Sequence, residues 1–375
     1  MLIFTRCPIL GSLGFDRTIY VGYAEYMSAR VIIATGISGS GRKEYLDRFE
    51  KYSATLGKKV KVYHVGQLML ERAERDGLNI TPKNILNTNK HTMQALRSGV
   101  YESILRNFKD DHKNYDAIVV SIHGFFYWKK TFHHSYDHHY ISRFKPDLFI
   151  TVMRDPVDVH QTLTDRDQWK RERLSIPEIA LWQNVETEVL ATWAELSRCP
   201  YYAFYDLQRL CTLYKLAFIP EMESTYISMP MTHMMDGPNR AKIERFIRKL
   251  EEHFVVFVPM ITKGKLPEVN QDLTKKTHGE YMTSYQTVKI DLDILLHQSD
   301  RIIVFFPKPV GSPGVVNELR EAHETNKEAW IIYPSKLVSP FLIYYYDRSF
   351  LNEKQFFTFL DNEKKHTSRF THKLD

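Results

Sequence analysis

The chain has 375 residues, 43% of them hydrophobic and 26% charged, which is ordinary for a globular protein with one large domain or two. No apolar run approaches the ~18 residues of a membrane-spanning helix, so no membrane partner is expected. The net charge of +6 is too dispersed to predict nucleic-acid binding. Three cysteines without paired spacing argue against a disulfide framework and favour a reducing, cytoplasmic compartment.

The first part of the chain alternates strand-like and helix-like segments. Residues 1–28 carry no secretory pattern and are interpreted as an extension. Strands are predicted over 31–35, 60–65, 117–122, 148–153 and 201–205, and helices over 43–56, 67–76, 92–109 and 176–196. This alternation predicts a mainly parallel sheet covered on both faces, in a first domain over 29–210.

A glycine-rich segment follows the first predicted strand and opens the first predicted helix. Its candidate nucleotide-binding residues are Gly36, Ser38, Gly39, Ser40, Gly41, Arg42 and Lys43. In this context the G-x-x-x-x-G frame predicts a phosphate-binding loop, because backbone N–H groups at a helix N-terminus favour an anion.

On these residues the first domain resembles archaeal-type adenylate kinases and related P-loop nucleotide kinases. The resemblance covers about 29–205, through 36–43, 64–78, 119–123 and 146–150. It implies ATP or another nucleotide at the loop. However, Arg42 stands where the family has lysine, Lys43 where a Ser or Thr reaches Mg²⁺, and Ser121 where an acidic residue is expected. Because phosphoryl transfer depends on metal and cation placement, we expect nucleotide binding rather than efficient turnover.

A second, smaller α/β domain, Rossmann-like (flavodoxin-like), is predicted over 222–345. Its strands are expected at 225–228, 254–259, 301–306 and 329–333, with a helix at 239–253. The boundary is placed in 210–224, which has no clear period, and the polar stretch 262–286 is interpreted as a long loop. Residues 346–375 are expected to be a tail, with a charged, frayed end.

The most informative motif of the second domain runs from Gly311 to Leu319. It joins a buried strand to a helix, so Ser312 and Glu318 are expected at the carboxyl end of a strand, with Glu318 on the first turn of the helix. Open α/β sheets bind ligands at that edge. A carboxylate there can act as a nucleophile or a base.

This domain resembles the nucleoside 2-deoxyribosyltransferase family, including the 2′-deoxynucleoside 5′-phosphate N-hydrolases, over about 224–340. The similar segments are 226–233, 299–300, 312–319 and 326–333. The resemblance implies Glu318 as the catalytic nucleophile and a homo-oligomer, with no cofactor needed for glycosidic cleavage. The substrate-binding residues that it implies are Ser228, Met229, Asp300, Ser312 and Gly314, Ser312 holding a 5′-phosphate.

The second catalytic carboxylate does not align directly. The family's aspartate position is Leu292 here, flanked by Asp291 and Asp293, and we favour Asp291. Oxocarbenium chemistry at a sugar needs such a second group for the proton of the base or the water.

The leading hypothesis is cleavage or transfer of the N-glycosidic bond of a (deoxy)nucleoside 5′-monophosphate, beside a degenerate nucleotide-binding P-loop domain. The alternatives are a nucleotide kinase using the first domain, and a non-catalytic nucleotide sensor. A zinc site at His133, His134, His138 and His139 is not favoured, because no matching ligand pair follows.

Overall fold

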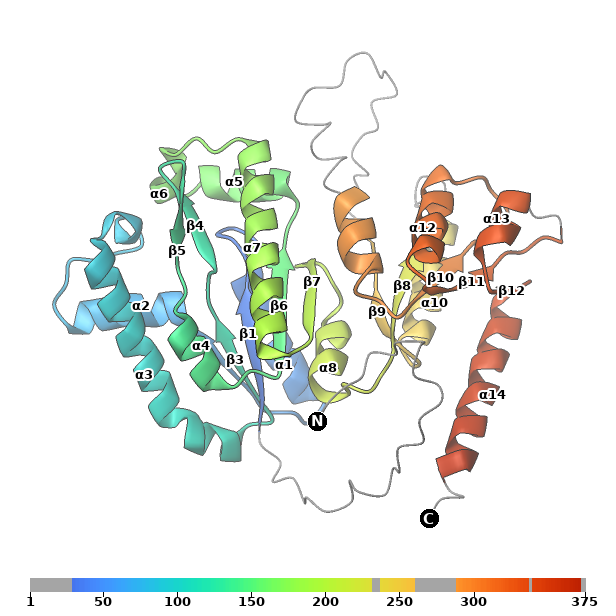
Figure 1. Cartoon of the computed structure of the whole chain (residues 1–375), viewed down its shortest axis with the longest axis horizontal. Coiled ribbons are helices and arrows are strands. Elements are labelled where there is room, and N and C mark those ends of the chain that lie inside the picture. Colours follow the sequence, from blue (N-terminus) through green and yellow to red (C-terminus); the bar gives the residue numbers. More distant parts are fainter. Residues whose placement is uncertain (1–28, 231–236, 260–287, 337–338, 372–375) are drawn as a thin grey trace.

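The structure, a computed structural model, describes residues 29–230, 237–259, 288–336 and 339–371. Two five-stranded sheets, both parallel throughout, lie side by side along the long axis of the molecule (Figure 1). The α/β architecture expected from the alternating pattern is thereby confirmed. The expected extension at 1–28 and the expected loop at 262–286 lie outside the described residues.

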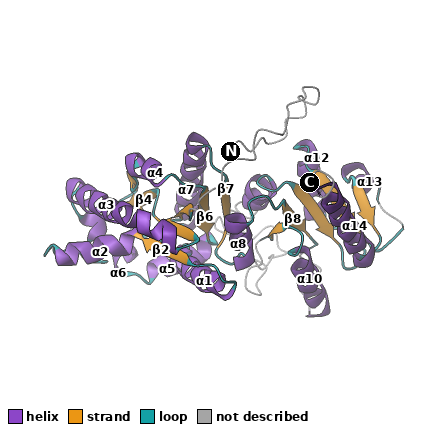
Figure 2. Cartoon of the chain, turned by 90° about the horizontal axis from the view of Figure 1, so that it is seen from below, coloured by secondary structure: helices purple, strands orange, loops and turns teal. Residues whose placement is uncertain are grey.

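The first sheet has the order β2-β3-β1-β6-β7. Its strands are β1 Arg30–Thr35, β2 Val60–His64, β3 Ala117–Ser121, β6 Leu148–Met153 and β7 Tyr201–Tyr205. Strand β1 alternates: Ile32 and Ala34 pack toward one layer of helices, while Val31 and Ile33 pack toward the other. Helix α1 covers the first face and α3, α4 and α7 cover the second, on opposite sides of the sheet in Figure 2.

The remaining elements of the first domain connect these strands. They are α1 Arg42–Thr55, α2 Val65–Arg75, η2 Ile85–Asn87, α3 Lys90–Asn114, β4 Phe125–Trp128, β5 Thr131–His134, α4 His138–Phe144, α5 Pro156–Thr164, α6 Asp167–Lys170 and α7 Ile176–Ser197. Strands β4 and β5 form an antiparallel hairpin that the sequence patterns did not predict.

The second sheet has the order β12-β11-β10-β8-β9. Its strands are β8 Ser224–Ser228, β9 Val255–Phe257, β10 Arg301–Phe305, β11 Glu328–Ile332 and β12 Arg348–Phe350. The helical elements are α10 Gly237–Leu250, η3 Ile290–Leu296, which is a π-helix, α12 Pro313–Glu324, α13 Pro340–Tyr345 and α14 Glu353–Thr371. Helices α10 and α14 cover one face, and η3, α12 and α13 cover the other.

Two expectations about domain limits differ from the structure. The stretch expected to be a boundary without periodicity contains helix α8, Leu210–Phe218, which packs on α1 and on β9. The expected tail is part of the second domain, because β12 pairs with β11 and α14 buries Phe356, Phe357 and Leu360. The segment folds onto the second domain, although it is rich in charged residues, because its clustered aromatic side chains pack into the core.

The two domains share one continuous apolar core. Tyr202 of β7 stacks on Phe257 of β9, with ring centroids 5.7 Å apart. Gln298 reaches the edge strand β7, accepting from the Ala203 N–H (2.9 Å) and donating to the Ala203 carbonyl (3.0 Å). This side chain therefore satisfies both backbone groups that the edge strand presents at that position.

Replacing Gln298 by alanine is expected to destabilise the protein by about 1–3 kcal/mol, because both Ala203 groups lose their partners in a part-buried interface. Urea unfolding of the full chain measures the effect. Gln67→Ala, which removes an exposed bond to Glu71, is the control and should change stability by less than about 0.5 kcal/mol. Equal effects for the two variants would contradict this account of the interface.

Candidate functional site

The loop from Gly36 to Arg42 connects β1 to α1, and its conformation requires glycine. Gly39 and Gly41 have φ of +85° and +75°, in the left-handed region. A Cβ at Gly41 would lie 2.3 Å from Nη2 of Arg154. Among the residues that the structure describes, none accepts a hydrogen bond from the N–H of Gly39, Gly41 or Arg42. The loop thus keeps backbone donors for an anion at the N-terminus of α1.

The Arg42 side chain folds back against the loop. Its guanidinium donates to the carbonyls of Gly36 (2.7 Å) and Ile122, and Nη2 lies 3.1 Å from Nε2 of His123. Because arginine can only donate, His123 Nε2 is the acceptor. Burial lowers the pKa of Arg42 to about 10. Burial, and then the charge of Arg42, hold the pKa of His123 well below its usual value.

Lys43 is turned to the surface, where Nζ pairs with Asp47 at 2.6 Å. The side chains of Arg42 and Lys43 are therefore engaged by the protein, so they do not reproduce the roles of the family's lysine and hydroxyl residue. The expectation that Arg42 and Lys43 bind the nucleotide is therefore corrected for their side chains, which contact protein groups instead. Ser38 lies at a cavity wall and Ser40 is buried.

The loop is also held in place by the buried carboxylate of Glu186. Glu186 of α7 accepts from the N–H groups of Gly36 (3.3 Å), Gly124 (2.8 Å) and Phe125 (2.8 Å). Burial raises the pKa of Glu186, which the hydrogen bonds and Arg42 partly offset. This residue was not predicted from the sequence. The available signal was an acidic residue in the buried stripe of α7, between Trp182 and Leu190.

A second ion pair closes the loop on its other side. Arg154 follows β6 and Asp206 follows β7, and Nη2 of Arg154 lies 2.6 Å from Oδ2 of Asp206. Nη1 of Arg154 also donates to the carbonyl of Gly39 (3.2 Å). The carboxyl ends of three strands, β1, β6 and β7, therefore meet at this loop, as expected at the ligand-binding edge of an open parallel sheet.

A cavity of about 590 Å³ opens beside Ser38. Its wall is mainly apolar, from α2, η2, α3 and α6, with Met69, Phe126 and Trp169 among the lining residues. The basic side chains at the wall are Lys83, Arg97, His123 and Arg166. Burial lowers the pKa of Arg97. No local sequence pattern indicates this cavity, because it is assembled from segments far apart in the chain.

In the second domain, Glu318 is held by two hydroxyl groups. Tyr226 donates to Oε1 at 2.9 Å, and Ser228 donates to Oε2. Both donors lie on the face of β8 that looks toward α12, since residues two apart in a strand share a face. Burial raises the pKa of Glu318 to about 7, against the lowering effect of the two hydroxyls. Glu318 is the sixth residue of α12, in its second turn and not its first.

Asp291 lies on η3, which packs against β8 and α12. Its charge raises the pKa of Tyr226, after the effects of burial and of Glu318. Asp293 is exposed, while Asp291 is half-buried with Oδ1 shielded from solvent. Asp291 and Glu318 therefore lie on neighbouring elements, and a catalytic role for Asp291 stays a prediction.

The other expected substrate-binding residues divide between this edge and other places. Ser312 caps α12, its Oγ accepting from Val315 N–H at 3.4 Å, and Gly314 is exposed in the first turn. Met229 is buried in the core on the α10 side of the sheet, opposite Glu318. Asp300 stands at the amino end of β10 and accepts from the Ser224 N–H at 2.7 Å. The expectation that Met229 and Asp300 bind substrate is therefore corrected. The Met229 side chain lies on the face of the sheet opposite Glu318, and Asp300 lies at the opposite end of the strands.

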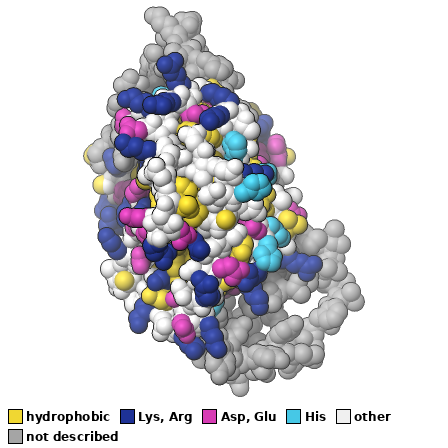
Figure 3. Space-filling view, turned by 90° about the vertical axis from the view of Figure 1, so that its left-hand side faces the viewer, with side chains coloured by type: hydrophobic (Ala, Val, Ile, Leu, Met, Phe, Trp, Pro, Cys, Tyr) yellow, Lys and Arg dark blue, Asp and Glu magenta, His cyan; other side chains and the backbone are white. Residues whose placement is uncertain are grey.

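The four histidines on β5 and α4 are all exposed. Figure 3 shows histidine side chains gathered on the face of the first domain turned away from the second. Within the described residues, no group of three or more His, Cys, Asp or Glu side chains could hold a metal ion. No helix in the described part of the chain is long and apolar enough to span a membrane.

A family model described as an AAA domain matches residues 35–180. The matched segment contains the Gly36–Arg42 loop, the residues that line the cavity, and Arg154. The model ends at residue 180, so the resemblance of 224–340 to the deoxyribosyltransferases stays a prediction. No curated protein sequence matches the chain.

Three solved structures are similar to about half of the chain. A sugar kinase from Janibacter sp. HTCC2649 is 10% identical with a TM-score of 0.29, over 51% of this chain and 93% of that one. A shikimate kinase from Bacteroides thetaiotaomicron is 14% identical with a TM-score of 0.31, over 50% and 97% of the two chains. An uncharacterized protein from Eubacterium ventriosum ATCC 27560 is 9% identical with a TM-score of 0.25, over 50% and 94%.

Proposed function

We propose that the first domain binds a nucleotide through its phosphates at the Gly36–Arg42 loop and a second anionic molecule in the adjoining cavity. The observation that carries this proposal is the cavity of about 590 Å³ beside Ser38, next to a loop whose N–H groups remain available. The match of the AAA-domain model over 35–180 supports it. For the first domain, this arrangement favours the two alternative hypotheses, a nucleotide kinase or a non-catalytic nucleotide sensor.

The side chains at the loop argue for binding that does not depend on Mg²⁺. Lys43 occupies the position of the metal-reaching hydroxyl and is paired with Asp47. Calorimetry with ATP and GTP, with Mg²⁺ and with EDTA, is the test, together with product analysis on nucleoside monophosphates. We expect similar affinity in both buffers and slow phosphate transfer. No heat of binding for either nucleotide would contradict the proposal.

Arg97 provides a specific prediction for the cavity. Its guanidinium lines the apolar wall and forms no ion pair with any described residue, so an anionic ligand would supply its partner. Arg97→Ala is expected to weaken binding of AMP by about tenfold or more, measured by calorimetry. Arg106→Ala, on the exposed side of the same helix, should leave AMP affinity unchanged. If both variants bind AMP like the wild type, AMP does not occupy the cavity.

We further propose that the second domain cleaves the N-glycosidic bond of a (deoxy)nucleoside 5′-monophosphate. The supporting observation is the Glu318 carboxylate held by Tyr226 and Ser228 at the carboxyl end of β8. In the proposed step a Glu318 oxygen forms a bond to C1′ while the bond to the base breaks. The electron pair leaves with the base, which takes up a proton, for which Asp291 is the candidate donor. Water, or another base, then displaces Glu318 from C1′.

The test is a panel of nucleoside and deoxynucleoside 5′-monophosphates incubated with the full chain, with released base measured by chromatography. Release from at least one member is expected from wild type. The glycosidic proposal fails if wild type and Glu318→Ala are equally inert on every member, and the nucleotide-binding proposal is unaffected by that result.

A further inference from the structure

Two segments that are far apart in the chain contribute to the wall of the cavity in the first domain. One is the 81–87 segment, which contains η2 and lines the cavity with Pro82, Lys83, Ile85 and Leu86. The other is 165–169, which includes the start of α6, and all of its residues line the cavity. Contacts between these two segments therefore form part of the cavity wall.

Side chains of α6 contact the 81–87 segment directly. Nζ of Lys83 lies 3.0 Å from Oδ2 of Asp167, in an ion pair whose two side chains are exposed. With its amide in the orientation that satisfies both neighbours, Gln168 donates to the Pro82 carbonyl (2.5 Å) and accepts from the Leu86 N–H (3.2 Å). Two consecutive residues of α6 thus hold the 81–87 segment by three polar contacts.

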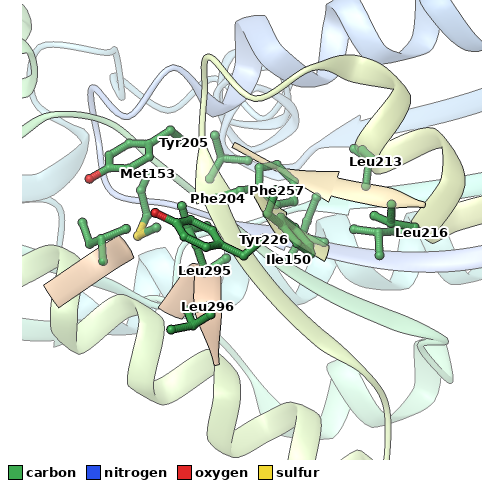
Figure 4. Close-up of a cluster of buried hydrophobic side chains, with 14 of the residues drawn as sticks. Ile150, Met153, Phe204, Tyr205, Leu213, Leu216, Tyr226, Phe257, Leu295 and Leu296 are labelled. Atoms are coloured by element: carbon green, nitrogen blue, oxygen red, sulfur yellow. The ribbon is translucent and has the colours of Figure 1, made fainter. Parts of the chain in front are cut away.

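Helix α6 itself is anchored in the apolar core. Trp169 is buried, and its ring centroid lies 5.3 Å from that of Trp128 and 5.1 Å from that of Trp182 on α7. Helix α5, which connects β6 to α6, packs on both α6 and α7. Strand β6 in turn ends at Met153, which is buried in the core that the two domains share (Figure 4). The α6 side of the cavity is therefore fixed by packing.

The 81–87 segment has no comparable anchor. No side chain from Glu74 to Ala95 is buried. Hydrogen bonds inside the segment close local turns, such as the one from the Ile85 N–H to the Thr81 carbonyl at 3.0 Å. A stretch with few buried apolar contacts opens locally at low free energy. The 81–87 segment is consequently the side of the cavity that can move.

We propose that the 81–87 segment is a gate on the cavity, and that Asp167 and Gln168 of the fixed helix α6 latch it shut before a ligand enters. The inference rests on the proposed binding of a ligand in the cavity. Gln168 is the stronger part of the latch, because an exposed ion pair contributes less than two hydrogen bonds of a part-buried amide. An anionic ligand competes with Asp167 for Lys83, which couples its entry to opening of the gate.

The first test needs no ligand and follows hydrogen exchange of the Leu86 amide by NMR in the full chain. Lys83→Ala and Asp167→Ala are each expected to raise the exchange rate about threefold, because the gate opens more often. The double variant should raise it no further than either single one, since both remove the same contact. Asp110→Ala, which removes an exposed contact with Lys113, is the control and should leave the rate unchanged. The gate is overturned if Leu86 exchanges at the wild-type rate in both single variants.

The second test is the kinetics of AMP binding, measured by stopped-flow tryptophan fluorescence, since Trp169 lines the cavity. Gln168→Ala is expected to raise the association and dissociation rate constants together by about tenfold, with AMP affinity within about threefold of wild type. Loss of a ligand contact, as expected for Arg97→Ala, raises dissociation alone. An unchanged association rate constant in Gln168→Ala overturns the gate. If wild type does not bind AMP, the proposed function of the cavity fails, and the Leu86 exchange still decides whether the segment is latched.

Discussion

Replacing Glu318 by glutamine is expected to lower base release from the preferred nucleoside monophosphate by on the order of 10⁴-fold. Glutamine keeps the shape of the side chain between Tyr226 and Ser228 but provides no nucleophilic oxygen for C1′. Initial rates from the nucleotide panel measure the effect. Glu324→Gln, at the exposed end of the same helix, is the matched control and should retain wild-type rates. A Glu318→Gln rate within tenfold of wild type would remove Glu318 from the chemistry.

The same substitution has a predicted signature in stability that needs no substrate. Burial raises the pKa of Glu318 from an ordinary 4.5 to about 7, so the folded state holds this proton more tightly than the unfolded state. The associated stability is fully present below about pH 4.5 and is lost as the pH rises through 7, a difference of roughly 3 kcal/mol. Urea unfolding at pH 4.5 and pH 8 should show Glu318→Gln near wild type at the lower pH and more stable at the higher. A gain that is independent of pH would contradict the assigned burial.

Arg42→Ala is expected to destabilise the first domain by about 3 kcal/mol and to abolish measurable nucleotide binding. The substitution removes the donors to the carbonyls of Gly36 and Ile122, and it removes the positive charge that offsets the buried Glu186 carboxylate. Chemical unfolding and calorimetry with ATP give the two measurements. Lys43→Ala, the next residue, breaks only a surface pair and should cost no more than about 1 kcal/mol.

A double-mutant cycle identifies the cause of the Arg42 effect. Glu186→Gln in the Arg42→Ala background removes the uncompensated buried charge, and it should recover a substantial part of the lost stability. If the two substitutions are strictly additive, Arg42 acts on the loop carbonyls alone and not through Glu186.

The local elements of this fold were readable from sequence patterns. The limits of the strands at 148–153 and 201–205 agree with the structure, because each is a continuous run of apolar, β-branched or aromatic residues between segments that contain polar residues or proline. The glycine spacing of 36–41 predicted the loop conformation, since two of its positions need a left-handed backbone. The boundary region and the tail were misjudged, because α8 and α14 are held by packing on distant segments rather than by a strong local pattern.

Only part of each candidate site could be predicted from the sequence. The loop, the strand-end position of Glu318 and the alternating α/β pattern were determined by residues close together in the chain. The inward turn of Arg42, the bracing by Glu186, the cavity wall and the removal of Asp300 and Met229 from the site were decided only by tertiary structure. The reason is physical: hydrogen bonding and periodicity set each element locally. Which side chains share a buried space depends instead on how segments a hundred residues apart pack together.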